Sequence, residues 1–441
     1  MTATAAAAPK LGENSIVKVA LTSAAATSIE WYDFFIYGTA AALVFPTLFF
    51  PADMPPAVAQ VAAFSTFAVG FIARPLGGVV FGHFGDKLGR KRALVVALLI
   101  MGAATTLIGL LPSYATIGVA APLLLILFRF AQGLAIGGQW GGAALLAIES
   151  APAGRKGFYG SFAQVGVPVG VVLANLIFLV MSANLAPEAF QSWGWRVPFV
   201  LSLLLVGLGL YVQLVLEDSP EFKALEIAEE SVISKQAKVR ERSPLLKVIA
   251  KHPKEILLAA GSFVASNGCF YIIITYVVAY ATKELSVSRS TILWAVLLGS
   301  MISAPTLLLT GAFSDRFGRR GVFMLGALLS GVWAFPFFML INTGAFLPML
   351  LAIAVGLTLM NMMYGPQAAL FAELFSIEVR YSGASLGYQL GAILGGGFAP
   401  MIAAALLTRY HTAMAISGYM AVLCFVSLVS IFLIAETNKR T

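Results

Sequence analysis

Charged residues are scarce in this 441-residue sequence, where they make up 11% of the chain. A soluble globular domain carries about 25%, so this scarcity excludes an ordinary water-soluble fold. Cysteine occurs twice and histidine three times, which gives no disulfide framework and no cluster of metal ligands. The patterns Gly-x4-Gly-Lys-(Ser/Thr) and His-Glu-x-x-His are also absent. The sequence therefore gives no sign of a nucleotide-driven pump or a zinc protease.

The net charge is positive, at +8, with 28 basic and 20 acidic residues. A basic balance can indicate nucleic acid, but here the basic residues follow the segments between apolar runs. If the N-terminus is cytosolic, 22 of them lie on the cytosolic side and four on the other, while Arg74 and Arg129 lie within apolar runs. This asymmetry obeys the positive-inside rule. We expect both termini in the cytosol and no nucleic-acid partner.

Long apolar segments are abundant, since hydrophobic residues make up 59% of the chain. About 20 apolar residues in a helix cross the hydrocarbon core of a bilayer. The first segment carries Glu30 and Asp33 and has no cleavage site, so we expect a retained helix there and not a signal peptide. In all, twelve segments predict an all-α, multi-pass membrane protein, near 20–48, 57–81, 93–111, 119–147, 158–182, 196–216, 255–281, 290–313, 321–341, 346–371, 382–407 and 413–434.

A loop motif occurs twice, each time between two apolar segments. Gly-His-Phe-Gly-Asp-Lys-Leu-Gly-Arg-Lys-Arg at 82–92 returns as Gly-Ala-Phe-Ser-Asp-Arg-Phe-Gly-Arg-Arg-Gly at 311–321. We infer an internal duplication, in which residues 1–217 form one six-helix bundle, 218–254 a cytosolic linker and 255–441 a second bundle. Duplicated helical halves are typical of secondary transporters, which bind substrate between them.

These paired loops resemble those of the major facilitator superfamily. Further motifs resemble the metabolite:H⁺ symporter family within it, namely Ile29-Glu-Trp-Tyr-Asp-Phe-Phe-Ile-Tyr37, Ala73-Arg-Pro-Leu-Gly-Gly78, Arg129-Phe-Ala-Gln-Gly133, Gly138-Gln-Trp-Gly-Gly142 and Gly194-Trp-Arg-Val-Pro-Phe199. The resemblance covers nearly the whole chain. One position departs from the pattern: Ser314 stands where the first loop has Gly85. The second loop therefore predicts tight packing at this position less strongly than the first.

The resemblance implies two pseudo-symmetric six-helix bundles and a proton-coupled symporter that imports a small organic acid by alternating access. The acid would be shikimate-like or a mono-, di- or tricarboxylate. A zwitterionic osmolyte such as proline or betaine stays open as the substrate, and a facilitator, an exchanger or a solute sensor stays open as the function. The family implies no enzyme activity, no cofactor apart from H⁺ as the coupling ion, and a bacterial inner membrane. We expect a monomer whose partners are an anionic small molecule and the bilayer.

Four charged side chains fall deep inside the apolar segments: Glu30, Asp33, Arg74 and Arg129. An ionisable group at such depth costs a few kcal/mol, so each is a candidate for function. Glu30, Asp33 and Tyr37 share one face of the first helix. In the resembled superfamily helices one, four, seven and ten line the central cavity, which gives as substrate-binding candidates Arg129, Gln132, Gln139, Trp140, Tyr37, Asn267, Tyr271, Asn361, Tyr364 and Gln367.

Two roles are open for Arg129. Its guanidinium group offers two parallel donors that match a substrate carboxylate, or it neutralises Asp33 or Glu30 and so holds helices one and four together. Burial favours the protonated form of a carboxyl group and a nearby arginine favours the ionised form. One of the two acids could therefore load and release a proton; we favour Asp33, with Glu30 as the alternative.

Charges at the cytosolic ends of the helices form a second group of candidates. Arg74 precedes Pro75 toward the cytosol, and the loop motifs with the residues after helices four and ten would form charge networks that hold one facing state. The predicted cytosolic gate consists of Arg74, Gly82, Gly85, Asp86, Arg90, Glu149, Arg155, Asp315, Arg319, Glu373 and Arg380.

Overall fold

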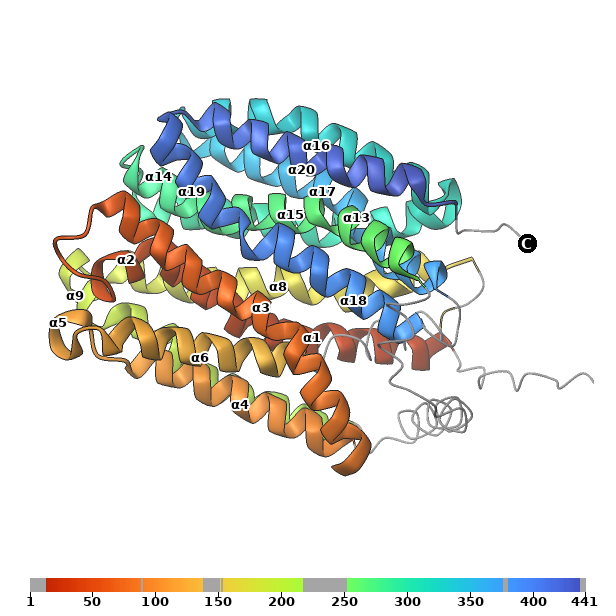
Figure 1. Ribbon diagram of the computed structural model, residues 1–441, viewed down its shortest axis with the longest axis horizontal. Coiled ribbons are helices and arrows are strands. Elements are labelled where there is room, and N and C mark those ends of the chain that lie inside the picture. The colour runs from red at the N-terminus through yellow and green to blue at the C-terminus, as the bar shows by residue number, and fades with distance from the viewer. Residues whose placement is uncertain are drawn as a thin grey trace, which may run out of the picture.

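The computed structural model describes residues 13–88, 90–137, 151, 154–216, 252–375 and 380–436. Side chains at 13–23, 25–26, 82–94, 163, 208–209, 211–216 and 380–382 are outside this description. Within these limits the chain is helical and forms no strand (Figure 1).

The first half contains six long helices joined by short helical turns. The long ones are α1 (Glu13–Leu43), α3 (Pro56–Leu88), α4 (Arg90–Leu110), α6 (Ala120–Gly137), α8 (Lys156–Asn184) and α10 (Val197–Leu216). The short ones are α2 (Phe45–Leu48), α5 (Tyr114–Ile117), α9 (Pro187–Ser192) and η1 (Gly194–Arg196).

The second half repeats this plan, with two of its helices interrupted by a π-helical turn. Its elements are α13 (Pro253–Tyr271), η2 (Ile272–Tyr276), α14 (Val277–Lys283), α15 (Arg289–Phe317), α16 (Arg319–Ile341), α17 (Phe346–Leu374), α18 (Arg380–Ala392), η3 (Ile393–Gly397), α19 (Ala399–Tyr410) and α20 (Ala413–Leu433). The π-helical turns are η2 and η3. Such turns often lie at functional sites.

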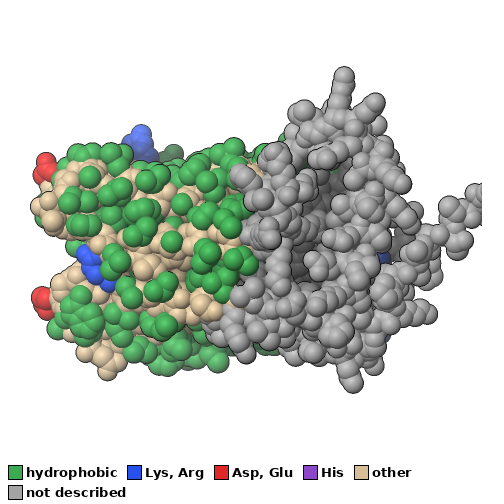
Figure 2. All heavy atoms as spheres, turned by 90° about the horizontal axis from the view of Figure 1, so that it is seen from below, with side chains coloured by type: hydrophobic (Ala, Val, Ile, Leu, Met, Phe, Trp, Pro, Cys, Tyr) green, Lys and Arg blue, Asp and Glu red, His purple; other side chains and the backbone are tan. Residues whose placement is uncertain are grey.

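The surface of the bundle is apolar, as expected of helices that face lipid. Nine helices in the described part of the chain are long and apolar enough to cross a membrane, and shorter apolar stretches occur in α4 and α10. Leu204 and Leu347 are each 71% exposed. Figure 2 shows apolar side chains over the described part of one face, with charged ones near one end. The architecture is that of a polytopic membrane protein in which each helix satisfies its own backbone hydrogen bonds.

Small residues bring pairs of helices into close contact. A side chain at Gly77 of α3 would collide with the carbonyl oxygen of Leu134 in α6, and one at Gly137 with that of Arg74. Gly166 of α8 lies in the same way against Thr27 of α1. Close approach at glycine is how helices associate in lipid, where there is no hydrophobic drive between them. Gly166 therefore allows α8 to approach α1 closely.

Contacts between the halves occur at both ends of the molecule. We call the end where α1 begins and α20 ends the terminal end, and the end with α5, α9 and α14 the far end (Figure 1). At the far end, the Lys283 ammonium donates to Gln60 Oε1, and Arg289 Cζ lies 4.5 Å from the centre of the Phe190 ring. At the terminal end, Gly157 of α8 packs against Gly311 of α15. The described contacts therefore join the halves at both ends.

Candidate functional site

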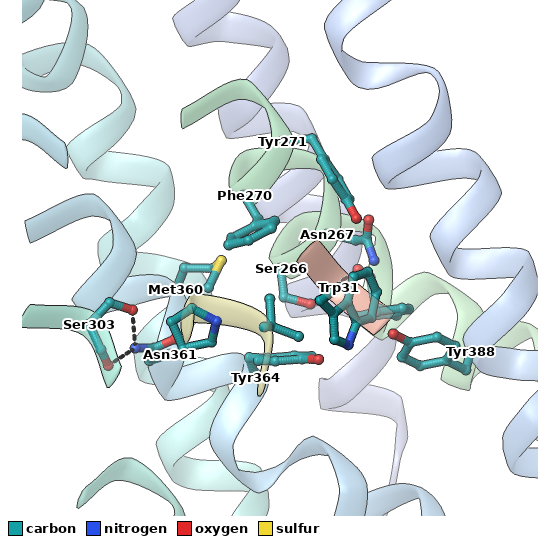
Figure 3. Close-up of a pocket in the computed structure, with 13 residues that line it drawn as sticks. Trp31, Ser266, Asn267, Phe270, Tyr271, Ser303, Met360, Asn361, Tyr364 and Tyr388 are labelled. Atoms are coloured by element: carbon teal, nitrogen blue, oxygen red, sulfur yellow. Dashed lines mark hydrogen bonds between the residues drawn. The ribbon is translucent and has the colours of Figure 1, made fainter. Parts of the chain in front are cut away.

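A pocket lies between the halves, with most of its wall in the second half (Figure 3). It contains about 410 Å³ of space not filled by protein atoms, part of which is open to solvent. No charged side chain lines it among the described residues. The lining residues are Trp31, Val167, Pro168, Phe263, Ser266, Asn267, Phe270, Tyr271, Ser303, Met360, Asn361, Tyr364 and Tyr388.

Two asparagines of the pocket have different surroundings. The Asn361 amide nitrogen donates to Ser303 O and Ser303 Oγ, each at 2.8 Å, and to Thr306 Oγ1 at 2.9 Å (Figure 3). It therefore joins α17 to α15. Asn267 Oδ1 is buried and has no partner among the described residues. Asn267 is thus the one of the two whose acceptor is free for a ligand.

Arg129 is fully buried in α6 and is surrounded by aromatic rings. Its Cζ lies 4.0 Å from the ring centre of Phe34, 4.1 Å from that of Tyr37 and 4.7 Å from that of Phe67. Nη1 donates to Gln132 Oε1 at 3.1 Å, while Nε and Nη2 have no partner in the described part of the chain. The rings stabilise the cation through their π faces, but they do not neutralise it.

Arg74 lies next to this cluster and not with the cytosolic charges with which the sequence grouped it. It is 1% exposed, and its Cζ lies 4.5 Å from the ring centres of Phe34 and Phe71 and 5.3 Å from that of Trp31. The physical reason is side-chain direction: long side chains in a helix point toward its N-terminus. Because α3 begins at the far end, the guanidinium group of Arg74 is directed away from the terminal end and toward the middle of the bundle.

Asp33 is buried but does not pair with Arg129. One carboxylate oxygen accepts a hydrogen bond from Ser202 Oγ, and the other has no partner among the described residues. Asp33 and Phe34 are successive residues, which an α-helix separates by about 100°. Phe34 thus meets the arginines while Asp33 faces α4 and α10. The ion pair considered from the sequence is not formed here.

A chain of polar side chains nevertheless connects the two groups. Gln132, which accepts from Arg129, donates through Nε2 to Thr105 Oγ1 at 2.7 Å. Thr105 in turn lies beside the Asp33 carboxylate. The cation and the acid are therefore linked through two neutral side chains from α6 and α4. Glu30, the alternative acid, is partly exposed.

Two other predicted substrate contacts lie away from the pocket. The Tyr37 hydroxyl donates to Thr66 Oγ1 at 2.6 Å, and its ring covers Arg129. Gln367 is buried, and both polar atoms of its amide lack a partner in the described chain. Tyr37 thus belongs to the aromatic surroundings of Arg129, and neither side chain is part of the pocket wall.

The terminal end carries a compact charge network. Arg319 donates to Glu373 through Nε at 2.7 Å and Nη2 at 2.8 Å, and to Asp315 through Nη1 at 3.2 Å. Asp315 also accepts the backbone N–H groups of Gly157 at 2.8 Å and Phe158 at 2.9 Å. A carboxylate at this position caps the N-terminus of α8. The structure thus brings Asp315, Arg319 and Glu373 of the second half together, and Asp315 joins this network to the start of α8 in the first half.

Packing at the second loop motif is tight despite the serine. Ser314 is fully buried and donates to Gly311 O at 2.7 Å. A side chain at Gly157 would lie 2.6 Å from Ser314 Oγ. The hydroxyl fits because it turns back onto its own helix.

The sequence also missed Glu436, whose carboxylate accepts the backbone N–H groups of Arg319 and Arg320 at the start of α16.

Several predicted site residues lie outside what the structure describes. Gln139, Trp140 and Glu149 fall in an undescribed segment, and only the helical backbone is described at Gly82, Gly85, Asp86, Arg90 and Arg380. Arg155 is described and exposed, directly before α8.

Four of the thirteen lining residues were predicted as substrate contacts, and the other nine, Trp31, Ser303 and Tyr388 among them, were not. Ser303 and Tyr388 come from the eighth and eleventh helices, which were not expected to line the cavity. For Tyr388, the sequence signal that could have indicated a lining residue was a hydroxyl group in a glycine-rich helix. Trp31 lies between Glu30 and Tyr32 and shows no pattern of its own.

Proteins of known function resemble this chain over nearly its whole length. The inner membrane metabolite transport protein YhjE of Escherichia coli is 43% identical over 97% of this chain and 96% of its own length. The shikimate transporter of the same organism is 40% identical, over 96% and 95%. The proline/betaine transporter of Salmonella typhimurium is 33% identical, over 98% and 87%.

Solved structures show the same fold. The xylose transporter XylE of Escherichia coli, in a partially occluded inward open conformation, matches with a TM-score of 0.74 at 17% identity, over 97% of this chain and 100% of that one. The family model described as "Sugar (and other) transporter" matches residues 19–441. The chain is therefore a membrane transporter and not an enzyme, and it belongs to the sugar (and other) transporter family of the major facilitator superfamily.

Proposed function

We propose that this protein is a proton-coupled symporter that imports a small organic acid by alternating access. The observation that supports it best is the pair of buried guanidinium groups, Arg74 and Arg129, beside a pocket for a small molecule. Neither has a carboxylate partner among the described residues. A buried charge without a partner is costly. A carboxylate on the substrate supplies the missing anion.

An acid suits the site better than a quaternary ammonium compound. Relatives are named for shikimate and for proline/betaine, so both kinds of substrate are candidates. A betaine headgroup needs a cage of aromatic rings. Here Phe34, Phe67 and Phe71 already contact the two arginines. A quaternary ammonium group held by the remaining rings of the pocket wall, such as Phe263 and Phe270, would add a further positive charge near arginines that lack a carboxylate partner among the described residues.

Asp33 is the proposed proton carrier. It is buried near the middle of α1, one of its oxygens is unpartnered among the described residues, and Thr105 and Gln132 connect it to Arg129. A change in the charge of Asp33 alters the electrostatic field at Arg129 through this short path. Glu30 stays the alternative, as it is one helical turn away.

The proposed orientation follows the positive-inside rule, with the terminal end in the cytosol of a bacterium and the far end outside. The contact of Lys283 with Gln60 then closes the outer side, and the network of Asp315, Arg319 and Glu373 lies at the inner side. Alternating access requires one set of contacts to form as the other separates. We expect the carrier to work as a monomer.

Uptake by purified protein in liposomes tests the proposal. With about two pH units of inward proton gradient, shikimate, proline and glycine betaine are offered in turn, with and without a protonophore. We expect accumulation of the acid that collapses with the protonophore. Uptake that equilibrates but never exceeds the outside concentration would identify a facilitator, and a preference for betaine would identify an osmolyte carrier. In a thermal-shift assay, a ligand at 100 times its dissociation constant should stabilise the protein by about 2.7 kcal/mol.

A further inference from the structure

We propose that Arg74 is the residue that receives the substrate's carboxylate, and that Arg129 does not contact the substrate. This inference rests on the proposed function and assigns its anion-binding group. The sequence favoured Arg129 for this role, but the pocket and the surroundings of the two guanidinium groups distinguish them.

Arg74 adjoins the pocket through residues that line it. Trp31 is a lining residue, and the Arg74 Cζ lies 5.3 Å from the centre of its ring. The side chain of Tyr271, another lining residue, lies next to the Arg74 guanidinium group, and Figure 3 shows Tyr271 beside Asn267 at one side of the pocket. The rings that cover Arg129, in contrast, are not part of the pocket wall. Arg74 is therefore the buried cation that adjoins the pocket wall.

The free edge of Arg74 matches a carboxylate. Its Nε and Nη2 are buried and have no partner among the described residues, although the side chain is only 1% exposed. These two nitrogens form one edge of the guanidinium group, which donates two parallel hydrogen bonds to the two oxygens of a carboxylate. Trp31, Phe34 and Phe71 around it exclude water, so the charge-assisted hydrogen bonds would be strong.

Arg129 presents the same edge to the protein and not to the pocket. A side chain at Gly70 would lie 2.6 Å from Arg129 Nε, so this nitrogen lies against the backbone of α3. Phe34, Tyr37 and Phe67 cover the group, and Nη1 is held by Gln132. Phe34 contacts both cations. None of the rings that cover Arg129 lines the pocket, so a substrate in the pocket does not meet this guanidinium group.

The remaining pocket wall restricts the class of substrate. It offers the acceptor of Asn267 and the hydroxyls of Ser266, Tyr364 and Tyr388, and no second cation among the described lining residues. A second carboxylate would enter without a positive partner. The site therefore fits a monocarboxylate that carries hydroxyl groups, in preference to a di- or tricarboxylate.

The experiment compares shikimate with its neutral carboxamide as competitors of shikimate uptake in liposomes. We expect wild type to prefer the acid by about 100-fold, the value of two charge-assisted hydrogen bonds. Arg74→Gln should reduce this preference to about 1, and Arg74→Lys should restore part of it. Arg129→Gln should keep the preference even where it lowers uptake. Arg409→Gln, which removes an exposed cation at the end of α19, is the matched control and should behave as wild type.

Each outcome separates the residue assignment from the proposed function. If wild type takes up none of the acids, the proposed function fails. If wild type prefers the acid, while Arg74→Gln keeps that preference and Arg129→Gln loses it, the carboxylate belongs to Arg129 and the inference is wrong. Because Arg74→Gln could impair folding, Tyr271→Phe provides a milder variant. It should lower acid affinity several-fold and leave the amide unchanged; an equal effect on acid and amide contradicts the inference.

Discussion

In the first half of the molecule, two buried arginines lie inside the bundle among aromatic rings, with guanidinium nitrogens that have no partner in the described chain. Among the described side chains of the second half, the buried arginine is Arg319, which lies at the terminal end and binds the carboxylates of Asp315 and Glu373. The halves share a fold and a loop motif, yet one half leaves its buried cations unneutralised and the other neutralises its cation.

This difference separates two uses of a buried charge. The charge of Arg319 is neutralised by carboxylates of the protein, and these bonds can hold helices in one arrangement. Arg74 and Arg129 lower the stability of the empty carrier, because the rings around them do not replace a carboxylate. This loss of stability in the empty carrier is offset when a substrate anion binds and supplies the missing carboxylate. The uncharged pocket wall of the second half then needs only to orient that anion.

Methionine at each arginine should change stability in opposite directions. Arg319→Met removes the cation that pairs with two carboxylates and should lower the free energy of unfolding by about 3 kcal/mol. Arg74→Met removes a buried charge that lacks a carboxylate and keeps an elongated side chain, so the melting temperature should rise. Thermal unfolding in detergent without substrate measures both. Arg289→Met serves as the control, with little change expected. A lower melting temperature for Arg74→Met would show that Arg74 is satisfied in the empty carrier.

Replacement of Asp33 tests the coupling assigned to the first half. The amide of the Asp33→Asn variant mimics the protonated acid and can still accept from Ser202. The variant should exchange substrate across the membrane but fail to accumulate it. With one proton per substrate, a gradient of two pH units supports an inside-to-outside substrate concentration ratio of about 100. In Asp33→Asn this ratio should fall to about 1. Glu30→Gln is the matched control and should accumulate normally. Normal accumulation by Asp33→Asn together with failure of Glu30→Gln would move the proton site to Glu30.

The sequence predicted the helices, the duplication and the depth of the buried charges, because each depends on composition and on spacing along the chain. It did not predict which way each side chain points. Asp33 and Tyr37 were placed on one face of the first helix, yet Asp33 accepts from Ser202 of α10 while the Tyr37 ring covers Arg129 of α6. Arg74 was placed by the position of its backbone, whereas its guanidinium group extends about a helical turn from there.

The wall of the pocket was predictable only in part for a related reason. In a membrane bundle, residues that face lipid and residues that face the interior are both apolar, so the hydrophobic pattern does not fix the rotation of a helix. Asn267 and Tyr271 were found because polar side chains are rare in these helices. Ser303 and Tyr388 were missed because the family pattern directed attention to other helices. The pairing of Arg319 with Glu373 was expected from the repeated motifs, and in the structure Arg319 Nε donates to the Glu373 carboxylate at 2.7 Å.

The close contact of α3 with α6 positions both arginines and should resist added volume. Gly77→Ala would place a methyl group on the carbonyl of Leu134, and we expect a loss of about 1–3 kcal/mol in stability. At Gly207 of α10 an added methyl group would meet no atom within 4 Å, so Gly207→Ala should be neutral or slightly stabilising. The melting temperatures of the two variants measure this difference in stability. A Gly77→Ala protein as stable as wild type would mean that α3 and α6 separate at little cost.

The smallest effect is expected at the contact between α15 and α8, where the second half reaches the first. Asp315→Asn keeps the size of the side chain but weakens its bonds to the N–H groups of Gly157 and Phe158 and to Arg319. A helix N-cap of this kind is worth about 1 kcal/mol, so the balance of the two facing states should shift about fivefold. Labelling of a single cysteine on the terminal side should therefore speed up, while the dissociation constant of the substrate stays nearly the same. Ser314→Ala, one residue away, is the comparison: its hydroxyl donates to its own helix and accepts from Arg319 Nη1 at 3.3 Å, but its loss leaves both N–H bonds of α8 to Asp315 in place, so the shift should be smaller. If Asp315→Asn instead changed the dissociation constant and left labelling as it was, Asp315 would act on the pocket and not on the gate.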